Sequence, residues 1–175
     1  MKVRALFTTL AASLLFASAA LANAASWNTY GNSQAGFSVE MPGEAKMSTE
    51  KVDGSVCYHV DAEVENVGYH VLSVDFGEDL SGSDNAQRIL DVVRDHILKG
   101  QNATAQSERE LELNGFPGRE IAFKSERGTY LMTRIYLVKS HLFTVSTEST
   151  ESGTSADGTR FFNSFHPELQ SPGAA

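Results

Sequence analysis

Alternating apolar and polar side chains predict two β-strands in the first half of the chain. Residues 36–42 place their apolar side chains on one side of a half-buried strand, which ends at Pro42-Gly43. Residues 56–65 alternate more regularly, with Val56, Tyr58, Val60, Ala62 and Val64 on one side and Cys57, His59, Asp61, Glu63 and Glu65 on the other. We expect this second, polar set to face water.

A turn at residues 66–68 is expected to reverse the chain into another alternating segment. The face predicted for this segment comprises His70, Leu72, Val74 and Phe76. Because the two segments are separated by so few residues, they are expected to pair as an antiparallel hairpin.

The spacing of apolar residues then changes to steps of three and four, which predicts an amphipathic helix. The apolar positions are Ala86, Ile89, Leu90, Val93 and Ile97. Ser83 is the expected N-cap, and Lys99-Gly100 is the expected end of the helix. The apolar stripe of this helix requires a sheet to cover.

Residues 107–145 are expected to form four more strands in quick succession. Residues 107–113 place Glu108, Glu110 and Glu112 on one face, and a turn at 114–118 leads into a strand carrying Ile121 and Phe123. Residues 129–138 are apolar on both sides, which is typical of a central strand. A turn at Lys139-Ser140 leads into the last strand, residues 142–145.

The end of the chain is expected to contain a loop, a short helix and a frayed tail. Residues 147–158 are rich in Ser, Thr, Glu and Gly and predict the loop. Phe161, Phe162 and Phe165 recur at helical spacing within residues 159–165, and we expect them to be core residues. Together these elements predict one α+β domain, an antiparallel sheet with flanking helices, over residues 25–168, followed by a tail at 169–175.

The first residues are typical of a secretory signal peptide. Lys2 and Arg4 precede an apolar run from Leu6 to Leu21. Small residues then provide two cleavage sites, after Ala22 and after Ala24, and we favour Ala24. We therefore predict a periplasmic or secreted protein with a leader at residues 1–24 and no membrane span after its removal.

The composition of the chain limits which partners it is expected to bind and which interactions can stabilise it. The 175 residues include 22 Asp and Glu against 14 Lys and Arg, a formal charge of −8, so nucleic-acid binding is not expected. Cys57 is the single cysteine, which excludes an intramolecular disulfide. We favour its interpretation as a partly buried small apolar residue over an exposed thiol that pairs with another chain. Stability must therefore come from the apolar core.

Four segments resemble the PsbP-like superfamily. They are residues 36–42, 113–120, 136–138 and 161–165, and the order of elements is similar from Trp27 to His166. This superfamily includes the extrinsic photosystem II protein, an import factor that binds the Ran GTPase, and many secreted bacterial proteins of unassigned role. The resemblance implies an α/β/α sandwich that acts by binding rather than by catalysis, and it transfers no catalytic residue.

The strand face of Cys57, His59 and Asp61 is the strongest candidate for chemistry. Thiolate, imidazole and carboxylate all ligate metals, yet neighbours on one strand face lie nearly 7 Å apart. His70 or His141 would therefore have to complete a metal or catalytic site. Because a solvated polar face explains the pattern more simply, we assign no metal ligand, catalytic residue or cofactor.

Three hypotheses about function follow. The first is a soluble, secreted, non-catalytic binding or accessory module with an unknown protein or small-molecule partner in the cell envelope. The second is a metal-binding protein or enzyme that uses the Cys57, His59 and Asp61 face. The third is an envelope component that assembles through a sheet edge or the aromatic C-terminal helix.

Overall fold

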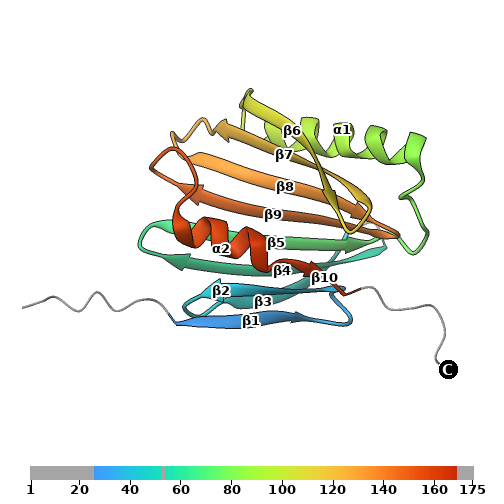
Figure 1. Ribbon diagram of the computed structural model, residues 1–175, viewed down its shortest axis with the longest axis horizontal. Coiled ribbons are helices and arrows are strands. Elements are labelled where there is room, and N and C mark those ends of the chain that lie inside the picture. The colour runs from blue at the N-terminus through green and yellow to red at the C-terminus, as the bar shows by residue number, and fades with distance from the viewer. Residues whose placement is uncertain (1–25, 53, 169–175) are drawn as a thin grey trace, which may run out of the picture.

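Two antiparallel sheets and two helices form the structure, a computed structural model that describes residues 26–52 and 54–168 (Figure 1). The large sheet has the order β3 (Lys46–Val52), β4 (Ser55–Val64), β5 (Val67–Asp75), β9 (His141–Ser149), β8 (Tyr130–Val138), β7 (Phe116–Lys124), β6 (Ala105–Leu113). The small sheet places β2 (Phe37–Pro42) between β1 (Trp27–Asn32) and β10 (His166–Pro167). The helices are α1 (Ser83–Gly100) and α2 (Ala156–Ser164). The α+β prediction is confirmed, and the predicted leader (1–24) and tail (169–175) lie outside the described residues.

Different elements cover the two faces of the large sheet. Helix α1 packs against β7 and β8 on one face, where the buried cluster consists of Ala86, Leu90, Ile135, Leu137 and Leu142. The small sheet and α2 cover the opposite face, where the larger core includes Phe37, Val39, Met41, Val60, Val71, Phe143, Val145, Phe161, Phe162 and Phe165. The predicted core role of the three C-terminal phenylalanines is therefore confirmed.

Strand β8 supplies side chains to both cores. Ile135 and Leu137 face α1, whereas Tyr136 and Val138 face α2 and the small sheet. Its position between β9 and β7 confirms the central strand that its apolar residues predict. A strand that is apolar on both faces is buried on both faces, as expected.

The β4–β5 turn lies earlier than predicted, and this changes the orientation of β5. Glu65 and Asn66 form the turn with positive φ angles of 52° and 65°, so that Val64 pairs directly with Val67. Tyr69, Val71 and Ser73 consequently enter the larger core. The predicted face of His70, Leu72 and Val74 lies on the other side of the strand and is half-buried.

The beginning of α1 also differs from the prediction. Gly82 is the N-cap, and its carbonyl oxygen accepts hydrogen bonds from the Asn85 and Ala86 amides at 3.1 and 3.0 Å. Ser83 is therefore the first helical residue and not the cap. At the other end Lys99 lies in the last turn, as expected.

Helix α2 begins three residues earlier than predicted because Ser155 caps it. The Ser155 hydroxyl oxygen accepts a hydrogen bond from the Gly158 amide at 3.0 Å. The segment predicted as a loop is correspondingly shorter, because β9 continues to Ser149 and the helix starts at Ala156.

A charged cluster attaches α2 to the large sheet. The Glu120 carboxylate accepts hydrogen bonds from the Nε atoms of Arg109 and Arg134 at 2.6 and 2.7 Å. The Arg134 guanidinium carbon lies 4.6 Å from the ring centre of Phe162 on α2. Burial disfavours ionised Glu120, but the hydrogen bonds from the two arginines outweigh burial and lower the pKa of Glu120.

Replacing Glu120 is expected to destabilise the protein and to reduce its sensitivity to acid. In Glu120→Gln, loss of the charged hydrogen bonds should lower the free energy of unfolding at pH 7 by about 1–3 kcal/mol. Because the folded-state pKa lies below the ordinary value of 4.5, this stabilisation is present above pH 4.5 and disappears as the pH falls through the folded-state pKa. Urea denaturation at several pH values measures the difference between variant and wild type.

The matched control is Glu40→Gln, which removes an exposed carboxylate 2.8 Å from Arg160. An exposed pair contributes at most about 1 kcal/mol, so this variant should stay close to wild type. An equal loss of stability in the two variants would contradict the role assigned to Glu120.

Candidate functional site

The polar face predicted from the sequence exists, but its residues pair with side chains of the neighbouring strands in separate places. Cys57, His59 and Asp61 share one side of β4. The His59 Nε2 atom lies 3.1 Å from Glu50 Oε1 on β3, and the His70 Nδ1 atom lies 2.7 Å from Asp61 Oδ1. Each imidazole therefore has its own carboxylate partner.

Cys57 is buried, which confirms the interpretation of this residue as a small buried apolar side chain, although its strand face as a whole is expected to face water. The residue is 6% exposed, and burial, followed by the nearby Glu50 carboxylate, raises the pKa of the thiol. A raised pKa leaves less thiolate, the form that attacks electrophiles and binds metals. The structure therefore gives this thiol the properties of a small buried apolar residue.

His141 lies on the opposite face of the sheet from Cys57 and does not join it. Its ring stacks on Phe143, with the ring centres 5.6 Å apart. Its Nδ1 atom is 3.9 Å from Asp75 Oδ1. Across residues 26–52 and 54–168, His, Cys, Asp and Glu side chains form no group of three or more that could hold a metal ion.

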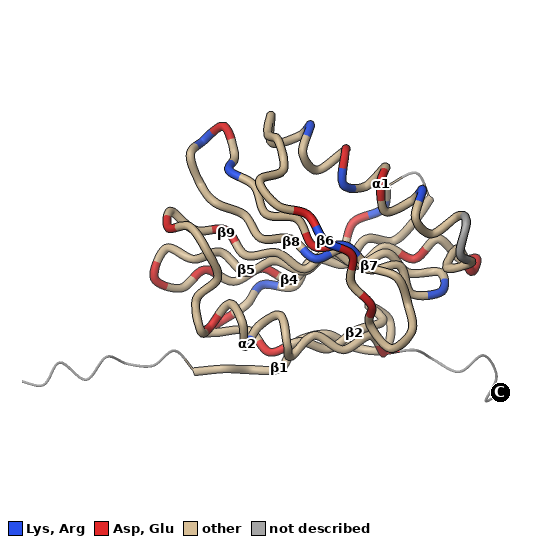
Figure 2. Tube along the Cα trace, turned by 45° about the horizontal axis from the view of Figure 1, so that its top comes forward, with Lys and Arg blue, Asp and Glu red and all other residues tan. Residues whose placement is uncertain are grey.

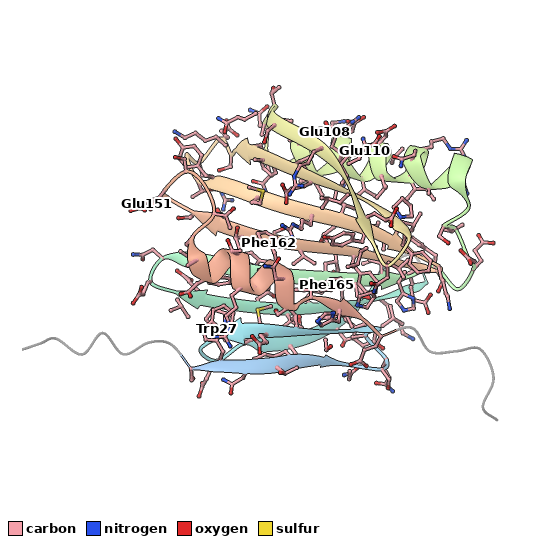
Figure 3. The ribbon with its side chains drawn as sticks, in the orientation of Figure 1. Trp27, Glu108, Glu110, Glu151, Phe162 and Phe165 are labelled. Carbon is pink, nitrogen blue, oxygen red and sulfur yellow. The ribbon has the colours of Figure 1, made fainter. Side chains whose placement is uncertain are left out.

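The acidic row of β6 is partly neutralised by basic residues. Glu108 Oε1 lies 2.9 Å from the Nη1 atoms of both Arg94 and Arg119. Arg119 is 7% exposed, so these bonds connect α1 to the sheet in a partly buried position. Figure 3 shows Glu108 and Glu110 on β6, away from α2 and its phenylalanines.

A cleft of about 560 Å³ opens at one end of the large sheet, on the face that carries α2. Its walls are the β4–β5 turn, the first residues of β8, and residues 149–155, which lead into α2. In Figure 3 the label Glu151 marks the segment of residues 149–155. A volume of this size is in the range of small-molecule sites.

The floor of the cleft is a row of side chains across four neighbouring strands. Tyr69 of β5 pairs with Thr147 of β9, Thr147 pairs with Met132 of β8, and Met132 pairs with Ala122 of β7. All four residues line the cleft. Residues directly opposite one another in a sheet point to the same side, so the strand register fixes this floor.

The rim of the cleft is polar and acidic. Its hydroxyl groups come from Thr147, Ser149, Thr150, Ser152, Thr154 and Ser155, and its carboxylates come from Glu65, Glu151 and Asp157. Figure 2 shows the acidic positions of the turn and of the loop before α2 at this end of the molecule.

Burial and the acidic surroundings of the cleft change the pKa of the Tyr69 hydroxyl. The residue is 3% exposed. Burial first, and then the negative charge of Asp157, raises the pKa of its hydroxyl, while a hydrogen bond with Ser155 opposes the change. Tyr69 therefore contributes a protonated, uncharged phenol to the floor of the cleft at neutral pH.

A second hollow, of about 550 Å³, lies between the small sheet and α2. The charges in this hollow are already paired, because Arg160 Nε lies 2.8 Å from Glu40 Oε2. The Arg160 guanidinium also lies 4.2 Å from the ring centre of Trp27. Since Arg160 and Glu40 already neutralise one another within the protein, the first cleft is the stronger candidate for a ligand site.

Comparison with solved structures supports a PsbP-like fold. The chain is similar to the solution structure of cyanobacterial PsbP (CyanoP) from Synechocystis sp. PCC 6803, with a TM-score of 0.51. The match covers 87% of this chain and 98% of that one at 14% sequence identity, so it shows the fold alone. No family model and no curated protein sequence matches the chain. None of the described helices is long and apolar enough to cross a membrane.

Proposed function

We propose that this protein is a secreted, periplasmic, non-catalytic binding module and that the cleft at the end of the large sheet is its ligand site. The observation that carries the proposal is the cleft itself, which combines a partly apolar floor with a rim of hydroxyl and carboxylate groups. Binding sites commonly have this combination of apolar surface and a few polar groups. The leader predicted at residues 1–24 supports secretion.

The proposal excludes a role for the Cys57 face in ligand binding. His59 and His70 are each held by a carboxylate from a neighbouring strand, and Cys57 is buried. These carboxylates occupy both imidazoles of that face within the protein. An accessory role that depends on a partner in the cell envelope therefore requires another surface, and the cleft provides one.

Filling the cleft is expected to abolish binding without unfolding the protein. Ala122 lies in the floor, so Ala122→Trp would occupy the space while keeping a residue type that strands favour. The protein is purified from its native envelope and examined by native mass spectrometry. We expect a small molecule or protein partner to copurify with the wild type and to be lost from the variant.

The matched control is Val92→Trp, which adds a large side chain at a position that is 63% exposed on α1. This variant should retain the copurifying partner. Thermal unfolding followed by circular dichroism verifies that each variant is folded. Retention of the partner by folded Ala122→Trp would show that the cleft is not the binding site.

A further inference from the structure

We propose that the cleft binds an organic ammonium group, carried either by a free polyamine or by a lysine side chain of a partner protein. This inference rests on the proposed function, because it names the chemistry of the ligand for the same site. It follows from the charge of the cleft, from the aromatic and apolar groups beside that charge, and from the number of hydroxyl acceptors.

The charge of the cleft is negative and is not compensated from within its walls. Glu65, Glu151 and Asp157 line it, and the described residues that line it include no Lys, Arg or His. Within residues 26–52 and 54–168, none of these three carboxylates forms an ion pair. The chain as a whole carries a formal charge of −8, so the general field has the same sign. An anionic ligand would be repelled, whereas a cation would gain partners.

The N-terminus of α2 at the cleft does not reverse this sign. A helix N-terminus carries a partial positive charge from its free amide groups. Here the Gly158 amide donates to the Ser155 hydroxyl at 3.0 Å and the Thr159 amide donates to the Ser155 carbonyl at 2.9 Å. Asp157 adds a full negative charge in the first turn. The Ser155 hydroxyl therefore occupies one of the free amides, and the charge of the Asp157 carboxylate exceeds the partial positive charge of the helix.

An ammonium group already contacts one aromatic ring of the cleft. The Lys124 Nζ atom lies 4.9 Å from the ring centre of Tyr130, and Tyr130 lines the cleft. Aromatic rings attract cations through the negative potential of their faces, so this contact demonstrates the chemistry beside the site. Lys124 itself is not among the residues that line the cleft.

The remaining lining suits the methylene groups that accompany an ammonium ion in amines and lysine. Val64, Val67, Leu131 and Met132 supply apolar surface. The hydroxyl oxygens of the rim accept hydrogen bonds, and an ammonium group has three donors and no acceptor. A small metal ion would not use the apolar surface, and a neutral sugar would not use the uncompensated charge.

The test is isothermal titration calorimetry with spermidine at low ionic strength, where screening is weak. The cleft variant is Glu65→Gln with Glu151→Gln, which leaves the cap and first turn of α2 intact. The control is Glu110→Gln with Glu112→Gln, which removes two exposed carboxylates on β6 and changes the net charge equally. We expect spermidine to bind the wild type. Its affinity for the cleft variant should be about tenfold lower, and its affinity for the control should lie within about twofold of the wild-type value.

Further titrations distinguish the sources of the ammonium group. The capped peptide acetyl-Ala-Lys-Ala-amide is titrated beside spermidine. Tighter binding of the peptide would assign the site to a protein lysine, and tighter binding of spermidine would assign it to a free polyamine. Either result, with the dependence on Glu65 and Glu151, supports the inference.

Three outcomes would overturn it. Equal weakening in the cleft variant and the control would show that only the general charge attracts spermidine. Displacement of spermidine by an equal concentration of Mg²⁺ would show that the site selects charge and not an organic ammonium. Failure of spermidine and the peptide to bind, while another ligand still copurifies and is lost from Ala122→Trp, would overturn the inference and leave the proposed function standing.

Discussion

Phe161→Ala is expected to lower the free energy of unfolding by about 3–5 kcal/mol, the typical cost of removing a buried phenylalanine. Phe161 is completely buried in the larger core. Its ring packs edge-on against Tyr69 at 5.3 Å between centres and lies 5.4 Å from Phe162. The alanine variant would leave a cavity between α2 and the floor of the cleft. Urea denaturation followed by circular dichroism measures the change.

The matched control is Phe76→Ala, at a phenylalanine that is 42% exposed. Removing this ring should cost no more than about 1 kcal/mol, because half of it already contacts water. Similar losses in the two variants would show that α2 does not pack on the sheet as described.

Leu90→Ala should cost about 2–5 kcal/mol, the range for truncating a buried leucine. Leu90 is completely buried on α1 and belongs to the cluster with Ile135, Leu137 and Leu142. The measurement is again urea denaturation. Val92→Ala, at an exposed position of the same helix, is the control and should change stability by about 0.5 kcal/mol or less.

A double variant that combines Phe161→Ala with Leu90→Ala tests whether the two cores are separate. They lie on opposite faces of the large sheet and belong to different buried clusters. Distant sites without shared partners are additive within about 0.5 kcal/mol. A coupling energy well above this value would contradict a structure with two independent layers.

The pattern of apolar residues predicts those elements that bury at least one side. Strand β4 and helix α1 each have one buried side, and β8 is buried on both, so all three leave a clear pattern in the sequence. Strand β3 was not predicted because all seven of its residues are exposed at the sheet edge. Because neither side of β3 is buried, its sequence does not need to alternate apolar and polar residues. The fold class was therefore predictable, while an edge strand was not.

The turn between β4 and β5 shows how a small error changes a face. A turn at residues 66–68 places His70 and Leu72 on the side of β5 that the observed turn at Glu65-Asn66 gives to Tyr69 and Val71. Side chains alternate with a period of two, so a shift of one residue reverses every position. The predicted face of β5 therefore contains His70 and Leu72, whereas Tyr69 and Val71 are the residues that enter the core.

The cleft could not be predicted because its parts are distant in the sequence. Its floor requires β9 to lie between β5 and β8, which brings Tyr69, Thr147 and Met132 into one row. The nearest signal in the sequence is the segment at residues 147–158, rich in Ser, Thr, Glu and Gly, and this composition predicts only a loop. Conversely, the Cys57 face was visible in the sequence, but the carboxylate partners of His59 and His70 depend on strand register.

The location of ligand binding tests the central claim most directly. The protein, labelled with ¹⁵N, is titrated with the unlabelled small molecule or partner that copurifies from the envelope, and amide chemical shifts are followed by NMR. We expect the largest changes at Tyr69, Met132, Thr147 and residues 149–155, which line the cleft. Changes concentrated instead at Cys57 and His59 would contradict the account and assign binding to the opposite face of the sheet.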